Sequence, residues 1–291
     1  MTLIDCIERM SEQLDSAGVA FGHGTTNAFD EAAWLVLWRL GLPLDALDEH
    51  AERALSAAEL ASVQALIGER IARRLPAAYL TGEAWLQGLP FFVDERCIVP
   101  RSLIAEPLVE GALDIFLPEA PARVLDLCTG NGSLAVLAAL AWPAARIVGT
   151  DLSADALAVA GRNVQRHALA ARIELRQGDG LGALRRHDRF DLVLCNPPYV
   201  NTRSMSELPP EFRAEPALAL AGGADGMDFV RGLLAGIARH LEPAGALVLE
   251  IGHERAFFEA AFPSLHPVWL NTSVGDDQVL LLSRADAESL K

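Results

Sequence analysis

Apolar runs and helical patterns alternate regularly through the middle of the chain, and this alternation constrains the fold more than any other feature. Runs of the length and composition of buried strands are separated by segments with helical spacing, one beginning near Ser133 and the next near Ala154. The expected strands are residues 122–127, 146–151, 173–177 and 190–196. A βαβ rhythm of this kind predicts an α/β fold with a doubly wound, mostly parallel sheet.

The two ends of the chain have different patterns. Residues 1–75 carry apolar side chains at helical spacing and predict a small all-helical domain. After a helix at about 226–241 and a strand at 246–252, alternating segments at 266–270 and 278–283 predict a C-terminal antiparallel hairpin. A further hairpin is expected from residues 91–94 and 97–100, around 94–96. We therefore predict three parts, at residues 1–77, 78–105 and 106–291.

The composition excludes several classes of protein. The 291 residues are 51% apolar and 22% charged, which is ordinary for a globular protein. No stretch reaches the roughly 20 apolar residues of a membrane span, and the acidic N-terminus does not resemble a secretory signal, so we expect a cytoplasmic protein without membrane contact. The four cysteines and seven histidines lack disulfide or metal-ligand spacing, and we predict no metal.

The net charge is −15 and the isoelectric point is near 4.8. Proteins that grip nucleic acid through its phosphates usually present a basic face, and only short arginine-rich pieces occur here. The charge therefore argues against a nucleic-acid partner and favours a basic protein as substrate.

The tetrapeptide Asn196-Pro197-Pro198-Tyr199 directly follows the strand at residues 190–195. Its prolines end the strand, and Asn196 is pushed toward extended backbone with its amide beyond the sheet. The carbonyl groups of Asn196 and Pro197 have few local donors, so they can accept hydrogen bonds from a ligand. This arrangement suits a planar nitrogen with two hydrogens, an amide or an aromatic amine. Taken alone, it is equally consistent with a strand that ends in a proline-rich turn.

Acids and glycines at the other strand ends predict a nucleoside-bearing cofactor. Gly130 and Gly132 precede a helix, and Asp151 ends the next strand, where an acid binds ribose hydroxyls. Asp126 stands before the glycines, where its carboxylate repels a pyrophosphate but suits the ammonium group or the hydrated sulfonium side of S-adenosylmethionine. Asp179, after the third strand, is positioned for the adenine amine. The sequence thus favours a methyltransferase over a dehydrogenase.

These motifs together resemble class I (Rossmann-like) methyltransferases that modify amino groups conjugated to a π system. The resemblance rests on Leu-Asp-Leu-Cys-Thr-Gly-Asn-Gly (residues 125–132), Asp151 and Asn-Pro-Pro-Tyr. The helical N-terminal part, residues 78–82 and Val-Pro-Arg-Ser at 99–102 are similar to bacterial protein-glutamine methyltransferases. Within these, residues 24–27, 31–32 and 92–96 with Cys128 look like the branch that acts on ribosomal protein L-three.

The resemblance implies a role for each of the three parts and for individual residues. Residues 1–77 would recognise the substrate, 78–105 would form a hairpin linker, and 106–291 would carry the methyltransferase site. Asn196 and the Pro197 carbonyl would take the two amide hydrogens of a glutamine, with Tyr199 beside them. S-adenosylmethionine would be held by Asp126, Thr129, Gly130, Asn131, Gly132, Asp151, Asp179 and Asn196. Substrate contacts would come from Arg101, Asn196, Pro197, Pro198 and Tyr199.

Several points remain open at this level. The family often has an aromatic residue after the third-strand acid, whereas this chain has Gly180, which leaves adenine stacking there in doubt. Arg101 and Glu106 could line the entrance or form a structural ion pair, and residues 215–217 and 222–226 could form a lid or an ordinary loop. Residues 250–252 are interpreted as shaping the sheet edge.

Four other functions compete with methylation of L-three. A release-factor glutamine methyltransferase usually has Gly-Thr-Gly-Thr-Gly and Pro-Arg-Pro-Asp-Thr-Glu, where this chain has Cys-Thr-Gly-Asn-Gly (128–132) and Pro-Arg-Ser-Leu-Ile-Ala-Glu (100–106). An adenine-amine methyltransferase lacks support from the charge. A cofactor-binding assembly factor would not need the tetrapeptide, and a dehydrogenase would bind NAD. The sequence predicts no oligomeric state.

Overall fold

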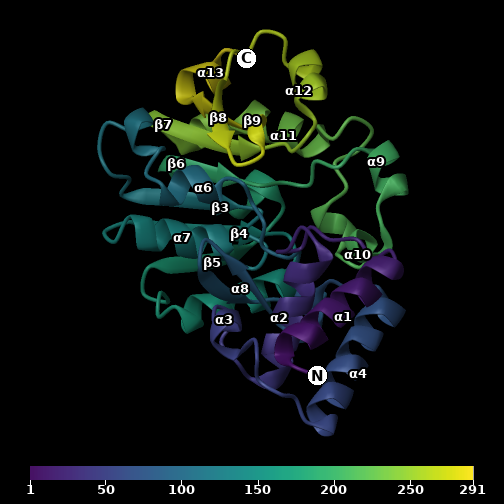
Figure 1. The fold of residues 1–291 in the computed structure, drawn as a ribbon. Helices are drawn as coiled ribbons and strands as arrows, with labels where there is room; N and C mark the ends of the chain where they lie inside the picture. The colour runs from purple at the N-terminus through teal and green to yellow at the C-terminus, as the bar shows by residue number, and fades with distance from the viewer. Residues whose placement is uncertain (291) are drawn as a thin grey trace.

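A seven-stranded sheet forms the centre of the molecule in a computed structural model that describes residues 1–290 (Figure 1). The strand order is β5-β4-β3-β6-β7-β9-β8; β3 to β7 are parallel, and β9 is antiparallel to both of its neighbours. The predicted doubly wound sheet with a C-terminal antiparallel hairpin is confirmed. The strands are β3 (Arg123–Leu127), β4 (Arg146–Asp151), β5 (Ile173–Gln177), β6 (Phe190–Cys195), β7 (Leu241–Glu250), β8 (Val268–Thr272) and β9 (Gly275–Ser283).

Helices cover both faces of the sheet because successive strand residues point to opposite sides. Val124 belongs to a core beneath α7 (Ser133–Ala141) and the end of α8 (Ala154–Arg166), whereas Leu125 belongs to a second core. That second core is closed by α11 (Asp228–Gly236), α12 (Arg255–Ala261) and α13 (Arg284–Glu288). Shorter elements connect these layers: α6 (Ala105–Val109), α9 (Thr202–Glu207), α10 (Pro210–Arg213) and the 3-10 helices η1 (Asp114–Phe116), η2 (Gly180–Ala183), η3 (Ala217–Ala219) and η4 (Ile237–His240).

The N-terminal helices pack around a core of their own. Leu3, Leu35 and Ile67, from three different helices, are completely buried there. Thr2 and Ser56 each begin a helix with a reciprocal capping box. The helices are α1 (Leu3–Ser16), α2 (Ala28–Leu40), α3 (Leu47–His50), α4 (Ala57–Arg73) and α5 (Ala77–Thr81). In Figure 1 they lie at the bottom of the molecule, with the C-terminal elements at the top. Their role in substrate recognition stays a prediction.

Two predicted elements differ most from the structure. The hairpin expected from residues 91–94 and 97–100 was placed wrongly: its strands are β1 (Glu83–Leu86) and β2 (Leu89–Phe92). Gln87 and Gly88 both adopt positive φ, as the two-residue turn of a tight hairpin requires, and Asp94–Cys97 forms an ordinary turn instead. β7 begins five residues earlier than the predicted 246, because Leu241 already pairs with Phe190 before a register shift.

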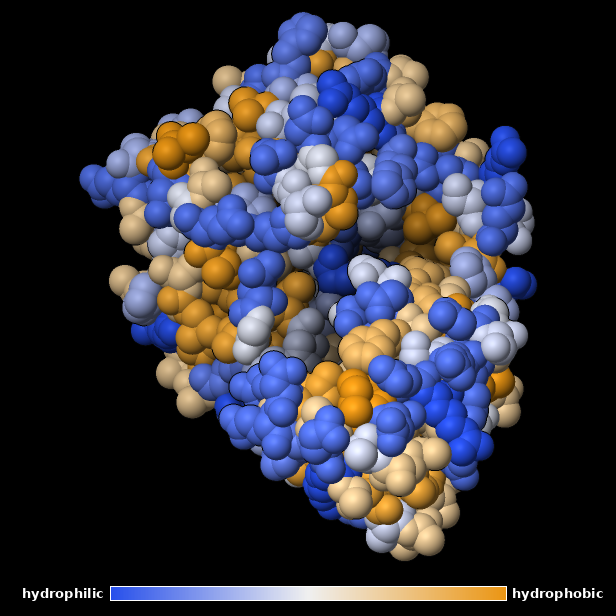
Figure 2. Space-filling model, in the orientation of Figure 1, coloured by the Kyte–Doolittle hydropathy of each residue, from blue (hydrophilic) through white to orange (hydrophobic). Residues whose placement is uncertain are grey.

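No helix within residues 1–290 is long and apolar enough to cross a bilayer. Figure 2 shows polar and apolar residues mixed over the visible face, which is hollowed near its centre.

Candidate active site

The carboxyl ends of four parallel strands open on one cavity. Leu127 at the end of β3 lies opposite Cys195 at the end of β6, so the turns that follow these strands are neighbours. Asp151 and Gln177 pair in the same way at the ends of β4 and β5. The cavity measures about 570 Å³, within the roughly 300–1,000 Å³ of small-molecule sites. It lies where the sheet order reverses between β3 and β6, the usual ligand position in open α/β sheets.

The glycine turn after β3 presents its backbone to this cavity. Gly130 has φ of +55°, and a side chain there would meet nothing within 4 Å, so the turn faces open space. Gly132 has a different function: a β-carbon would lie 3.1 Å from that of Ala160, so this glycine allows α7 and α8 to approach. Asn131 is buried behind the turn, where its side chain accepts a hydrogen bond from the Ser133 amide at 3.2 Å. Of these predicted cofactor residues, Gly130 lines the cavity.

Asp126 holds the turn from behind. Its Oδ2 accepts hydrogen bonds from the Thr129 hydroxyl and, at 2.9 Å, from the Ala135 amide in the first turn of α7. Burial raises the pKa of Asp126 to about 7, although both hydrogen bonds act in the opposite direction. Its Oδ1 finds no partner within residues 1–290. Asp126 and Thr129 therefore shape the turn, and their contact with a cofactor stays a prediction.

Asp151 connects two of the turns and lines the cavity. One carboxylate oxygen accepts from the Gly130 amide and the other from the Ser153 amide, both at 2.9 Å. Burial raises the pKa of Asp151 above its ordinary value, opposed by these hydrogen bonds. The predicted acid thus stands beside the glycine turn, and its contact with a ribose stays a prediction.

The far end of the cavity contains two apolar side chains that the sequence did not indicate. Asp179 and Gly180 both line the cavity, and the predicted contact of Asp179 with adenine stays a prediction. Phe229 of α11 also lines it, and its ring would lie 3.6 Å from a β-carbon at Gly180. Leu152, which follows Asp151, is 46% exposed and lines the same cavity. Leu152 and Phe229 could cover a flat apolar ring, although Gly180 has no side chain to do so.

The tetrapeptide divides between the cavity and the protein interior. Asn196 and Pro198 line the cavity, and Pro197 is buried between them. Tyr199 turns toward β7: its hydroxyl donates to Glu250 Oε1 at 3.2 Å, and its ring occupies the space that a side chain at Gly252 would need. The structure therefore brings Asn196 to the cavity and anchors Tyr199 on the neighbouring strand.

Glu250, interpreted from sequence as part of the sheet edge, anchors a second segment. Its Oε2 accepts from the Ser102 hydroxyl at 2.6 Å and from the Leu103 amide at 2.9 Å. Burial raises the pKa of Glu250, and the hydrogen bond from Ser102 partly offsets this. One carboxylate thus ties Tyr199 to the residues that follow Arg101.

Arg101, predicted to contact substrate, is engaged by Glu215. The guanidinium donates from Nη1 and Nη2 to the two oxygens of Glu215 at 2.6 and 2.7 Å. Glu106 is not its partner, since that carboxylate accepts from Ser273. Glu215 is followed by residues 216–219, which line the cavity, so this loop contributes directly to the site.

Comparisons with known proteins agree with this geometry. The profile of the Methyltransferase small domain matches residues 112–223. A solved methyltransferase from Pyrococcus furiosus has a similar fold, with a TM-score of 0.50 and 19% identity over 76% of this chain and 97% of that one. The hMettl16 catalytic domain in complex with MAT2A 3′UTR hairpin 1 reaches a TM-score of 0.53 at 13% identity, covering 82% of this chain and 84% of that one. The fold is that of a class I, Rossmann-like methyltransferase.

More similar relatives identify the branch. The chain is 55% identical to the ribosomal protein uL3 glutamine methyltransferase of Bordetella pertussis over 97% of its length and 95% of the relative's. It is 50% identical to that of Burkholderia pseudomallei, over 98% and 95% respectively. The chain belongs to the family of ribosomal protein uL3 glutamine methyltransferases.

Proposed function

We propose that this protein transfers a methyl group from S-adenosylmethionine to the side-chain amide nitrogen of a glutamine in ribosomal protein uL3, the L-three protein of the sequence comparison. The observation that carries this proposal is the position of Asn196, whose amide borders the same cavity as the glycine turn and Asp151. The family relatives support uL3 as the substrate. The net charge of −15 suits a basic ribosomal protein.

The cavity fits S-adenosylmethionine in size and chemistry. Open space lies in front of Gly130, the Asp151 carboxylate can accept ribose hydroxyls, and Leu152 with Phe229 can cover an adenine ring. Asp179 stands at the same end and can accept from the adenine amine. When bound, the cofactor supplies a methyl group on a positively charged sulfur.

Asn196 and Pro197 act on the nucleophile, which is a poor one. The lone pair of an amide nitrogen is shared with its carbonyl, so the nitrogen is almost without basicity. The Asn196 side-chain oxygen and the Pro197 carbonyl would accept its two hydrogens and aim the nitrogen at the methyl group. Orientation of this kind can lower a barrier by roughly 7–11 kcal/mol in the best intramolecular cases.

The same two acceptors stabilise the positive charge that develops on the nitrogen. The nitrogen becomes acidic as it gains the methyl group, so its proton leaves without a strong base. Tyr199, held by Glu250, keeps the end of the tetrapeptide rigid while this occurs.

The direct test is methylation of isolated uL3. The purified chain is incubated with labelled S-adenosylmethionine and uL3. A parallel reaction contains a peptide-chain release factor in place of uL3. We expect label in uL3, and peptide mass mapping should locate one methyl group on a glutamine. Label in the release factor alone would contradict the proposed substrate but keep the chemistry.

A further inference from the structure

Two walls of the cavity come from outside the central sheet. One is the linker wall, residues 96–98, which follows the β1–β2 hairpin. The other belongs to the cover segment, residues 209–221, which follows the tetrapeptide and contains α10 and η3. Of this segment, residues 216–219 and 221 line the cavity. The width of the cavity on this side depends on how these two segments are held together.

Glu215 joins the two walls at a single carboxylate. It immediately precedes the lining residues of the cover segment, and its Oε1 accepts from the Val99 amide at 2.8 Å, directly after the linker wall. Both oxygens also accept from the Arg101 guanidinium, two residues further along. The side chain of Glu215 is completely buried, whereas that of Arg101 is 26% exposed.

The N-terminal helical part holds the same segment. His23 Nε2 lies 3.4 Å from Glu215 Oε2, and the His23 ring packs on Phe212 of the cover segment with centroids 4.2 Å apart. The Arg101 guanidinium lies 5.6 Å from the centroid of the same Phe212 ring. A side chain at Gly22 would strike this ring at 2.9 Å, so the approach is close.

A second carboxylate of the cover segment extends this contact to α4. Glu211 is completely buried and lies 3.2 Å from Arg70 Nη1 and 2.7 Å from Arg74 Nε. Arg70 is also completely buried and donates to Glu31 of α2 at 2.8 Å. The cover segment therefore has ionic anchors at the end of α4 and in the linker.

We propose that Glu215 is a positioning residue of the methyl-transfer site: its carboxylate fixes the separation of the linker wall and the cover segment, so that the helical part of the chain determines the shape of the cofactor cavity. The inference rests on the proposed function. It gives the N-terminal part a role in building the site, in addition to any contact with uL3.

The charge of Glu215 is what makes this junction specific. Burial alone would raise the pKa of its carboxyl, but the ion pair with Arg101 and the contact with His23 together lower that pKa to about 2. Replacing Glu215 with glutamine removes the negative charge that pairs with Arg101. It also places an amide group against the guanidinium, and we expect the two walls to move apart as a result. Aspartate keeps the charge but is one methylene shorter, so the walls must shift to keep the bond.

The test measures binding of S-adenosylhomocysteine to the full chain by calorimetry in the Glu215→Gln and Glu215→Asp variants. We expect the Kd of Glu215→Gln to rise roughly tenfold, within the ordinary range of coupling between sites. The kcat of uL3 methylation should fall by about 100-fold, as displacements of about 1 Å can cause. A purely structural role would change neither quantity per folded molecule.

Asp188→Asn is the matched control, because Asp188 is a buried carboxylate paired with arginines away from the cavity. Its variant should unfold more easily yet bind S-adenosylhomocysteine within about twofold of the wild type. If the Glu215→Gln variant does not fold, the Kd of S-adenosylhomocysteine for Glu215→Asp tests the same inference. Wild-type affinity and kcat in a folded Glu215 variant would overturn the inference. Wild-type protein that binds the probe but leaves uL3 unmodified would instead contradict the proposed substrate.

Discussion

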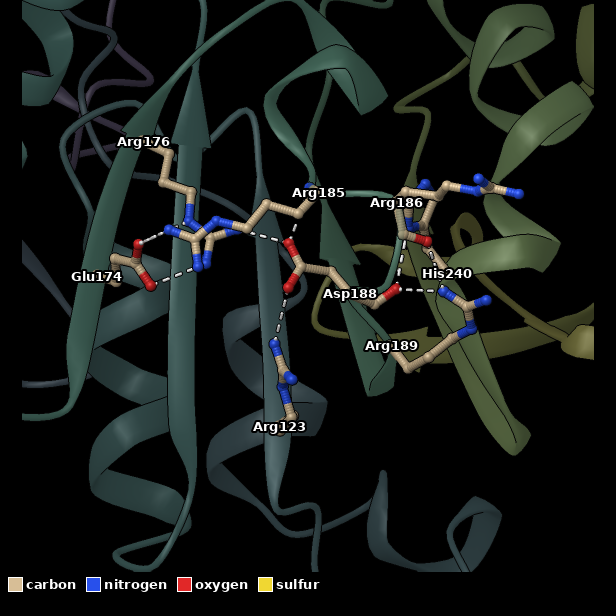
Figure 3. A network of polar contacts seen from close by, with 8 residues as sticks. All are labelled: Arg123, Glu174, Arg176, Arg185, Arg186, Asp188, Arg189 and His240. Carbon is tan, nitrogen blue, oxygen red and sulfur yellow. Dashed lines mark hydrogen bonds and ion pairs between the residues drawn. The ribbon is translucent and has the colours of Figure 1, made fainter.

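Glu215 and Asp188 are electrostatically alike but lie at opposite ends of β6. Asp188 precedes the strand and accepts from Arg176 at 2.6 Å, Arg123 at 3.2 Å and the Arg185 amide at 2.9 Å (Figure 3). Basic partners lower the pKa of both carboxyls to about 2 against the opposing effect of burial: arginines at Asp188, and Arg101 with His23 at Glu215. The partners of Glu215, however, adjoin the cavity walls, whereas those of Asp188 join β3, β5 and the loop before β6. The two depressed pKa values therefore look the same, and only the position of the partners relates either ion pair to function.

Substituting Asn196 with alanine should have the largest effect on kcat. The change is confined to the cavity end of β6. The variant loses one acceptor for the amide hydrogens, so kcat should fall roughly 10²–10³-fold, or about 3–4 kcal/mol of transition-state stabilisation. Thermal unfolding and the Kd of S-adenosylhomocysteine should stay near wild type. Steady-state kinetics with uL3 measure the change, and near wild-type turnover would remove Asn196 from the mechanism.

Asp188→Asn should have the opposite profile, with a loss of stability and intact chemistry. Breaking a buried pair costs about 3 kcal/mol, the lower end of the usual range, because Arg123 is 43% exposed and can be solvated. Urea unfolding measures this loss, and the activity per folded molecule should be unchanged. If kcat falls while the free energy of unfolding does not, the contrast between the two ends of β6 is wrong.

The strand ends that border the cavity could be located from the sequence because the information there is local. Glycines after one strand, an acid after the next and Asn196 after a third each appear beside an apolar run, and parallel pairing aligns their ends. The anchors of the site could not be found in this way. Arg101 and Glu215 are 114 residues apart, and Ser102 and Glu250 are 148 apart, so no period or short motif joins them.

The misplaced hairpin has a different cause. Both the observed and the predicted hairpin strands are short apolar segments, and the choice between their turns depends on backbone conformation. Gln87 adopts a positive φ that its residue type does not announce. Phe229 was missed because it lies on a helix far along the chain, and only tertiary packing places its ring against Gly180.

Acid conditions should destabilise the folded chain by protonating Asp188 and Glu215. Each carboxyl should contribute less to this loss than the substitutions above. The pKa of Asp188 is about 2 in the folded chain against 3.8 for the free side chain, so the unfolded chain binds more protons between these values. Its stabilising contribution is complete above about pH 5 and is lost as the pH falls through about 2. Urea unfolding from pH 6 down to 3 should show a shallower pH dependence in Asp188→Asn. An unchanged slope would mean that Asp188 is not the titrating group.

Tyr199→Phe should give the smallest effect and separates two roles for this residue. The variant removes the hydrogen bond to Glu250 Oε1, while Ser102 and Leu103 still donate to Oε2. The expected loss of unfolding free energy is therefore only about 1 kcal/mol, with a kcat close to wild type. Urea unfolding and steady-state kinetics of the same preparation give both quantities. Because the hydroxyl points toward β7, a large loss of kcat with unchanged stability would show that Tyr199 contacts the reacting groups when substrate is bound.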